Sequence, residues 1–419
     1  MSVPARRPRA SIFFFDGWIS ISVSVVGAAT ELLARGYDVD LFFNRPQGEL
    51  PSADLPAGIA LHEYVPWTRR LTGKLLSRLR RRKLEELSKI TADDNVRKKS
   101  ARLRALAKAV LGLIEIPQFA LYCRRHARKT DLAIAFDMNS LVAMDFALPR
   151  ATPFIYWSLE IWRLTDLADP FSRAVKRHEI RRLGQALAVV VQSPVRRAII
   201  EEDLPAPLPN YVEVPNAPSV PMPASLQRDF YSRRFPIPPG AWVVLHSGFI
   251  STSLMSLEIA KSVPSWPEEF VLVFHERQPR DPQEPYLRAV QQAGGARTFL
   301  SLKPVPFAEV DNVYAGAHIG LVCYQTAEVN EATAWASSGK LVYYLRHGLP
   351  IIVIMPECPP ILSECRCGEW VSDFDGIGPA LARIAADYDS YAARARATYD
   401  KLFNFHGAFD RLMQAVGHG

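Results

Sequence analysis

Short apolar runs alternate with longer amphipathic segments along most of the chain. A compact apolar run bounded by turn residues is typical of a buried strand, and apolar positions three and four apart are typical of a helix. In the first half, this pattern predicts strands at 12–15, 39–43, 132–136, 154–157, 188–192 and 211–214, and helices at 23–35, 140–147 and 171–185. In the second half, it predicts strands at 242–246, 270–275, 297–300, 319–324 and 350–354, and helices at 256–262, 283–293, 307–317, 338–347, 388–405 and 408–416.

This alternation predicts an α/β fold with parallel sheets covered by helices on both faces. It stops at a proline-rich stretch, where ten of the 33 prolines fall between Pro205 and Pro239, and then starts again. We therefore expect two Rossmann-like, doubly wound domains that face each other across a ligand-binding cleft. The expected boundaries are 1–215 for the first domain, 216–240 for the linker, 241–395 for the second domain, and 396–419 for closing helices that pack back on the first.

The net charge of +7 is concentrated in one segment. Residues 69–104 carry 14 Lys or Arg and four acids, which gives +10, whereas the other 383 residues sum to −3. Leucines recur there at spacings of three to five, so we predict an amphipathic helix within a basic helical insertion at about 68–130. The segment fits an anionic membrane surface, or a solvated helix packed on its own domain. Nucleic acid is not expected as a partner, because the segment has no aromatic residues for base stacking.

Missing motifs exclude several enzyme classes. The chain has no GxGxxG fingerprint, no GxxxxGK[ST] P-loop, no HExxH and no GxSxG. Its apolar stretches fall short of the roughly 20 residues that span a membrane, and the run at 12–15 is too short for a signal peptide. The expected location is the cytoplasm, and the basic segment adds the option of peripheral attachment to the inner face of the cell membrane.

Metal and cofactor signals are weak. The Asp-x-Asp triplets at 38–40 and 373–375 have a spacing that can chelate a divalent ion beside a diphosphate, but triplets this short also arise by chance. Cys358, Cys365 and Cys367 match no zinc-ligand spacing, and the odd total of five cysteines argues against a complete disulfide framework. We expect no metal and no other cofactor.

A candidate anion site lies at the start of the predicted helix 338–347. The run Ser337-Ser338-Gly339-Lys340 combines a hydroxyl residue at the N-cap, a glycine that lets a ligand approach, and a lysine in the first turn. The N–H groups and the dipole of a helix N-terminus both favour a phosphate there. The alternative is an ordinary capped helix with an incidental lysine.

The same region resembles the two-domain glycosyltransferases of the GT-B fold, in particular the retaining family 4. That family carries a similar run, S-x-K-L-x-E-Y-L-x-x-G-x-P, which stands here as SGKLVYYLRHGLP at 338–350. The stretch at 214–218 is similar to the V-P-N that ends the family's first domain, and 244–248 to the strand and glycine that open the second. Residues 305–318 are similar to a further stretch of that domain. The resemblance covers nearly the whole chain outside 45–130.

The chain also departs from that family. Tyr343 stands where the family has a Glu that holds the nucleotide ribose. The usual Arg and Lys after the second domain's first glycine are missing, so Arg277 and Lys340 are the candidates for the cationic clamp on the donor diphosphate. The family's E-x7-E pair is absent from its usual place.

The resemblance implies transfer of a sugar from a nucleotide-sugar donor to a glycan or lipid-linked acceptor, in polysaccharide or glycoconjugate synthesis. Developing charge on the leaving diphosphate needs cations and N–H donors, and a carboxylate on the first domain can accept the acceptor's proton. A sugar-nucleotide epimerase and a non-catalytic glycan- or partner-binding protein of the same fold remain as alternatives. The implied donor-binding residues are Gly248, His275, Glu276, Arg277, Lys303, Val305, Asn330, Glu331, Ser338, Gly339 and Lys340. The acceptor-side residues are Gly17 and Trp18, and the catalytic candidates are Asp137, Glu160 and Glu328.

Overall fold

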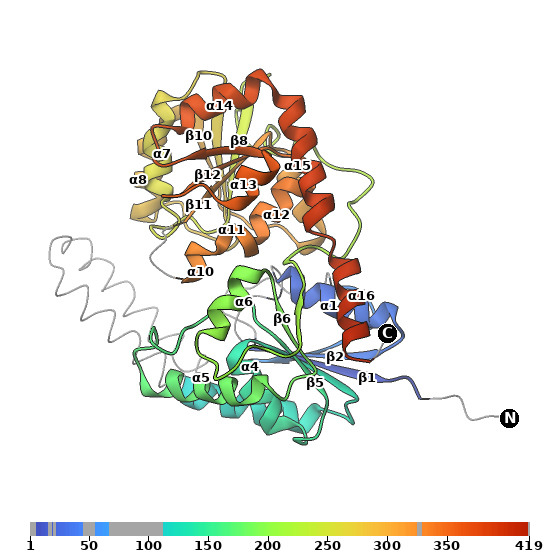
Figure 1. The fold of residues 1–419 in the computed structure, drawn as a ribbon. Helices are drawn as coiled ribbons and strands as arrows, with labels where there is room; N and C mark the ends of the chain where they lie inside the picture. Colours follow the sequence, from blue (N-terminus) through green and yellow to red (C-terminus); the bar gives the residue numbers. More distant parts are fainter. Residues whose placement is uncertain are drawn as a thin grey trace.

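The computed structural model describes residues 6–15, 19, 22–44, 55–66, 112–324 and 329–417 of the chain. They form two α/β domains, each built on a parallel sheet (Figure 1). Buried strand residues alternate between the two faces of a sheet, so that Ile12 and Phe14 belong to one apolar cluster and Phe13 to another. Parallel strands covered on both faces consist of nearly continuous apolar residues, which is why the sequence pattern identifies them.

The N-terminal domain contains seven parallel strands in the order β3-β2-β1-β4-β5-β6-β7. Its strands are β1 (Arg9–Phe14), β2 (Asp38–Asn44), β3 (Ile59–Tyr64), β4 (Leu132–Phe136), β5 (Phe154–Trp157), β6 (Ala188–Val191) and β7 (Tyr211–Glu213). Its helices are α1 (Val23–Ala34), a helix over 112–126, α4 (Asp137–Ala147), α5 (Pro170–Leu183) and α6 (Pro194–Glu201).

The C-terminal domain contains six parallel strands in the order β10-β9-β8-β11-β12-β13. Its strands are β8 (Trp242–Ser247), β9 (Phe270–His275), β10 (Thr298–Ser301), β11 (Ile319–Cys323), β12 (Ile351–Ile354) and β13 (Gly368–Val371). Its helices are α7 (Ser256–Ser262), α8 (Pro285–Gly294), α9 (Val310–Ala315), α10 (Val329–Ala332), α11 (Ala334–Ser337), α12 (Gly339–Arg346), α13 (Pro360–Cys365) and α14 (Ile377–Ala386). The chain ends in α15 (Tyr388–Leu402) and α16 (Phe405–Ala415).

The predicted α/β class and the predicted strands are confirmed, with β4, β5 and β9 matching to the residue. The pattern missed β3 and β13, which are edge strands of their sheets. An edge strand is covered less completely, and β3 accordingly carries His62 and Glu63 instead of a continuous apolar run. It also missed α6, although Ser193 caps that helix and Pro194 occupies its first position.

In both sheets the strand order reverses beside the first strand, between β1 and β4 and between β8 and β11. Open α/β sheets bind ligands at this switch point, beyond the carboxyl ends of the strands. The loops that follow β4, β5, β8, β9 and β11 all contribute to one cavity between the domains. The topology therefore brings the two switch points together.

The last helix lies against the N-terminal domain, beside α1 (Figure 1). The ring of Phe405 stacks on that of Trp157, with ring centres 6.1 Å apart. Gly27 of α1 leaves room for this contact, because a Cβ at that position would lie 2.7 Å from Cζ of Phe405. The chain thus crosses between the domains at two places, once after β7 and once between α15 and α16.

The proline-rich stretch between β7 and β8 has no regular helix or strand. It is nevertheless anchored, since Phe230 and Tyr231 are almost completely buried. Both rings pack edge-on against His275 at the end of β9, with centres 6.2 and 6.4 Å away. This stretch therefore belongs in part to the core of the C-terminal domain.

Most of the predicted basic insertion, residues 67–111, lies outside the described residues. The helix over 112–126 that follows it buries Ile116, Phe119 and Cys123 and exposes Leu113 and Leu121. None of the helices in the described part of the chain has the length and apolar character needed to cross a bilayer.

Candidate active site between the two domains

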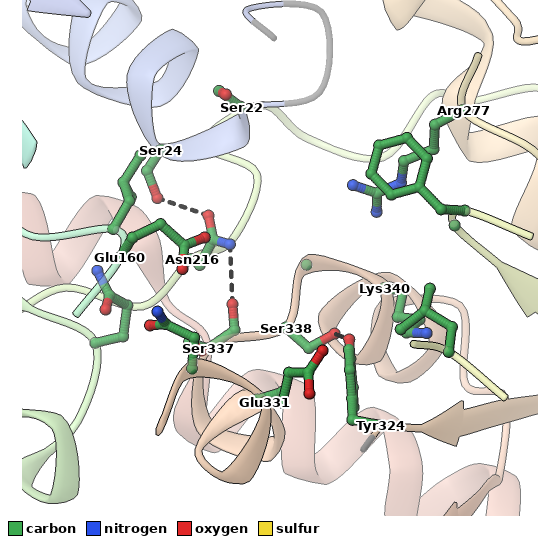
Figure 2. A pocket seen from close by; sticks show the side chains of 18 of the residues that line it. Ser22, Ser24, Glu160, Asn216, Arg277, Tyr324, Glu331, Ser337, Ser338 and Lys340 are labelled. Carbon is green, nitrogen blue, oxygen red and sulfur yellow. Dashed lines mark hydrogen bonds between the residues drawn. The ribbon is translucent and has the colours of Figure 1, made fainter. Parts of the chain in front are cut away.

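A cavity of about 600 Å³ lies between the domains and is lined by both. Figure 2 shows its two sides. Arg277 and Lys340 of the C-terminal domain lie on one side, and Ser24 and Glu160 of the N-terminal domain lie on the other. The C-terminal side of the cavity therefore carries two cations and the carboxylate of Glu331, and the N-terminal side carries the carboxylate of Glu160.

Lys340 occupies the second position of α12 and is only 3% exposed. Among the described residues, its ammonium nitrogen has no hydrogen-bond partner. The pKa of Lys340 is lowered to about 7, chiefly by burial; Cys323 acts in the opposite direction, and the charge of Arg277 adds to the lowering. A buried cation without a counter-charge is costly, so this position is poised for an anionic ligand.

The surroundings of Lys340 leave space for such a ligand. Gly248 has φ of +128°, a conformation that L side chains rarely adopt, and a Cβ there would lie 4.0 Å from Nζ of Lys340. Ser338 is the N-cap residue of α12, but its hydroxyl makes no cap hydrogen bond and lies 2.7 Å from the hydroxyl of Tyr324. Half-buried Arg277 enters the cavity from the loop after β9 (Figure 2).

On the opposite side, Asp137 and Glu160 line the cavity but differ in their contacts. Asp137 is buried, has φ of +63°, and accepts hydrogen bonds from the backbone N–H groups of Leu159 at 2.6 Å and Glu160 at 3.0 Å. Its carboxylate thus holds the loop after β5. The side chain of Glu160 is exposed at the cavity (Figure 2).

Two residues expected in the donor site serve the core instead. His275 is buried against Ser301, whose hydroxyl lies 3.0 Å from Nδ1, and burial lowers the pKa of His275 to about 3. Glu276 is fully buried and accepts from the N–H groups of Ile250 and Arg277. Burial raises the pKa of Glu276. Neither lines the cavity, although Glu276 shapes it by holding the loop after β8.

Of the remaining predicted residues that the structure describes, five line the cavity and two do not. Gly248, Asn330, Glu331, Ser338 and Gly339 line the cavity. Lys303 is exposed elsewhere on the C-terminal domain, and Val305 packs against its core. Gly17, Trp18 and Glu328 lie outside the described residues.

Polar residues of the cavity that were missed from the sequence include Arg196 and Asn216. Arg196 of α6 is 1% exposed and donates to the hydroxyls of Thr333 and Ser337 across the domain boundary, at 3.2 and 3.0 Å. Asn216 accepts from Ser24 at 2.7 Å and donates to the carbonyl of Ser337 at 3.0 Å (Figure 2). The sequence did offer a signal for Arg196, since Ser193-Pro194 directly after a buried strand predicts the start of a helix. The first turn of such a helix lies at the edge of the sheet where ligands bind.

The position of the family's ribose-binding glutamate is occupied differently here. Tyr343 is 6% exposed and stacks on Tyr314, with ring centres 4.7 Å apart and ring planes at 9°. It does not line the cavity. Tyr343 therefore cannot replace that glutamate, and a contact to a nucleotide ribose would have to come from another residue.

The Asp-x-Asp triplets at 38–40 and 373–375, and a third at 387–389, do not contribute to the cavity. Asp38 and Asp40 lie at the start of β2 and pair with Arg9 at 3.2 and 2.6 Å. Asp373 is exposed and accepts from the N–H of Gly376. No group of three or more metal-ligating side chains occurs within the described ranges.

No protein-family model and no curated protein sequence matches the chain. Solved structures match both domains together. HepE from Anabaena, solved with UDP and glucose, is 12% identical, with a TM-score of 0.63 over 97% of this chain and 99% of that one. Sucrose-phosphate synthase from Thermosynechococcus elongatus is 16% identical, with a TM-score of 0.60 over 98% of each chain. A UDP-forming α,α-trehalose-phosphate synthase from Burkholderia vietnamiensis is 12% identical, with a TM-score of 0.57 over 98% of this chain and 100% of that one.

At these identities the likeness establishes the architecture alone. The order of strands in both sheets and the cavity between the domains agree with it. Membership of the retaining family 4 stays a prediction. The chain has the GT-B fold, the two-domain architecture of these glycosyltransferase structures.

Proposed function

We propose that the protein transfers a sugar from a nucleotide-sugar donor to a hydroxyl of a glycan or lipid-linked acceptor. The donor diphosphate would lie at the N-terminus of α12, between Lys340 and Arg277. The acceptor would enter on the side of the N-terminal domain, beside Glu160. One structural neighbour was solved with UDP and another is a UDP-forming synthase, so UDP sugars are the first donors to test.

The buried, unpartnered ammonium of Lys340 carries this proposal. It lies in the first turn of an eight-residue helix, where the helix dipole adds to its positive charge. As the bond from the sugar to the diphosphate breaks, negative charge grows on the leaving oxygen. Lys340, Arg277 and the N–H groups of α12 would stabilise that charge, and the burial of Lys340 strengthens its contribution.

The acceptor half of the reaction needs an oxygen nucleophile. The acceptor hydroxyl forms the new bond to the anomeric carbon and loses its proton, which the carboxylate of Glu160 can accept. If the sugar keeps its anomeric configuration, as the family 4 resemblance implies, the donor phosphate is the other acceptor for that proton. We assign the diphosphate stabilisation to protein cations without a divalent metal, because the Asp-x-Asp carboxylates lie away from the cavity.

Mass spectrometry of nucleotide sugars retained on the purified protein, followed by a donor screen with and without glycan acceptors, tests the proposal. Glycosylated acceptor and free nucleoside diphosphate are the expected products. Lys340→Met should abolish turnover, whereas the control Lys261→Met, at an exposed lysine of α7, should not. Conversion of the sugar on its nucleotide without acceptor would identify an epimerase, and binding without turnover would identify a non-catalytic protein. Absence of any nucleotide-sugar binding would refute the proposal.

A further inference from the structure

The loop at 158–161, directly after β5, is held by side chains. Asp137 accepts from the N–H groups of Leu159 and Glu160, at 2.6 and 3.0 Å. Gln192 donates to the first carbonyl of the loop at 2.5 Å. Buried backbone groups outside regular secondary structure need such partners, and here the N-terminal domain supplies several of them.

A further partner of this loop comes from across the domain boundary. Asn330 of α10 donates to the carbonyl of Ile161 and accepts from its N–H, each at 2.8 Å. In this way one amide side chain satisfies both backbone groups of a residue in the other domain. Figure 1 shows α10 and α11 facing the N-terminal domain near α6.

Arg196 ties the same loop to the same segment from the opposite direction. Its guanidinium donates to the carbonyl of Leu159 at 2.6 Å and to Thr333 and Ser337 at 3.2 and 3.0 Å. It also lies 3.4 Å from Oδ1 of Asn330. Because Arg196 is 1% exposed, water cannot replace these partners without separating the domains.

The loop and the donor side are therefore parts of one hydrogen-bonded unit. Ser337 directly precedes Ser338, Gly339 and Lys340 at the N-terminus of α12. The side chain of Glu160 is exposed at the cavity opposite Lys340 (Figure 2). Burial lowers the pKa of Arg196, and the carboxylates of Glu160 and Asp137 are near enough to act in the opposite direction.

We propose that Asn330 and Arg196 are positioning residues that fix the Glu160 loop against the acceptor only when the two domains are closed on each other. The part of this inference that concerns an acceptor rests on the proposed function. Opening of the domains would remove both hydrogen bonds to Ile161 and leave the Arg196 guanidinium with Leu159 alone. Domain opening and release of the Glu160 loop are then one event.

Hydrogen exchange on the protein alone tests the positioning. Asn330→Ala and Arg196→Lys should speed exchange in the peptide that covers 158–161 by about tenfold. Arg197→Ala is the matched control, because Arg197 is the next residue of α6 and pairs with Glu201 and the ring of Tyr211. Its exchange at 158–161 should match that of the unmodified protein. Unchanged exchange at 158–161 in both test variants would overturn the proposal.

Peptides from β4 and β9 report whether a variant has lost its fold. If Asn330→Ala unfolds, Asn330→Asp serves instead, because it can still accept from the N–H of Ile161 but cannot donate to its carbonyl. This variant should give a smaller increase in exchange at the same loop. Exchange at 158–161 equal to that of the unmodified protein in Asn330→Asp and Arg196→Lys would again overturn the proposal.

A comparison of transfer with donor hydrolysis tests the consequence for Glu160. With the donor and acceptor found by the screen, Asn330→Ala and Glu160→Gln should each lower transfer by about a hundredfold, as displacement of a reacting group does. Donor hydrolysis and UDP affinity are measured in the same variants, and transfer should fall by at least about tenfold more than either of them. Equal losses of transfer and hydrolysis would place Asn330 in the donor site and overturn the inference. The exchange experiment decides the positioning even if no donor is turned over.

Discussion

The ammonium nitrogen of Lys340 lies 4.5 Å from the centre of the Tyr324 ring. A cation over an aromatic face gains about 0.5–2 kcal/mol, which is less than the hydration that a buried ammonium loses. Tyr324 also holds Ser338 through its hydroxyl, so the same side chain orients the start of α12. The aromatic contact therefore keeps Lys340 in place and leaves its charge available for an anion.

Affinity for UDP should fall as pH rises above 7. Burial lowers the pKa of Lys340 to about 7, so the free protein loses this charge near neutral pH. A bound diphosphate favours the ammonium form, and binding above pH 7 must then take up a proton. Linkage gives a decrease in affinity of about tenfold per pH unit while one proton is taken up.

Titration calorimetry in buffers with different ionisation enthalpies measures this proton uptake. The measurements run from about pH 7.5 to 9, so that they begin about half a unit above the pKa of Lys340. Lys340→Met should bind UDP weakly and without proton uptake. Binding to the unmodified protein that does not vary over this range would show that Lys340 does not meet the diphosphate.

Alanine at either cation should weaken nucleoside diphosphate binding. Charge-assisted hydrogen bonds contribute about 1.5–3 kcal/mol each, so Lys340→Ala and Arg277→Ala should each raise the dissociation constant by about tenfold or more. Lys261→Ala provides a control of the same charge change at an exposed site. Calorimetric affinities that are unchanged in both single variants would refute the assignment of these two residues.

Activity should persist in excess EDTA. The aspartates of the first Asp-x-Asp triplet pair with Arg9, and neither this triplet nor the one at 373–375 lines the cavity. The measurement is turnover of the identified donor before and after chelation, with magnesium or manganese added back. Complete loss of activity that a divalent ion restores would favour a metal-dependent transferase.

The fold could be predicted because its central strands are buried on both faces. Leu132–Phe136 is completely buried, and its sequence alone marks a strand. Edge strand β3 carries no such pattern, since Leu61 is 38% exposed and His62 and Glu63 are only partly covered. Its existence depends on pairing with β2, which a local pattern does not contain.

The candidate site could be predicted from local chemistry where one segment supplies it. The run from Ser338 to Lys340 is contiguous, so its chemistry was visible in the sequence. Arg196 and Asn330 meet across 134 residues, and no local signal relates them. His275 was predicted in the donor site because the end of β9 faces the ligand edge. Its side chain instead packs against Phe230 and Tyr231, which lie far from it in the sequence.

Substitution of Gly27 by valine should destabilise the protein. A Cβ at Gly27 would lie 2.7 Å from Cζ of Phe405, and the ring is held between Trp157 and Phe409. Overpacking of this kind costs about 1–3 kcal/mol. Gly184→Val is the matched control, because a Cβ there meets nothing within 4 Å. Thermal or denaturant unfolding measures the difference, and equal stability of the two variants would contradict the tight contact between α1 and α16.

The segment at 69–104 should bind the protein to anionic membranes. Its charge is +10 and that of the remaining residues is −3, so attraction to an anionic surface is concentrated there. The helix over 112–126 continues this character, since Leu113 and Leu121 are 54% and 47% exposed and basic residues follow at its end. Each basic residue near an anionic surface contributes about 1 kcal/mol, and the attraction decays within about 8 Å at physiological salt.

Sedimentation with liposomes measures this binding. It should increase with the fraction of anionic lipid and fall as salt rises from about 0.1 to 0.5 M, because screening shortens the reach of the charges. Replacing Arg78, Arg80, Arg81 and Arg82 by Ser should reduce it strongly. The control removes the same charge at exposed arginines elsewhere and should leave binding unchanged. These arginines are Arg177, Arg181, Arg288 and Arg411. If both sets of substitutions lowered binding equally, net charge and not this segment would be responsible. Equal sedimentation with neutral and anionic vesicles would contradict membrane binding, and the basic segment would then have another purpose.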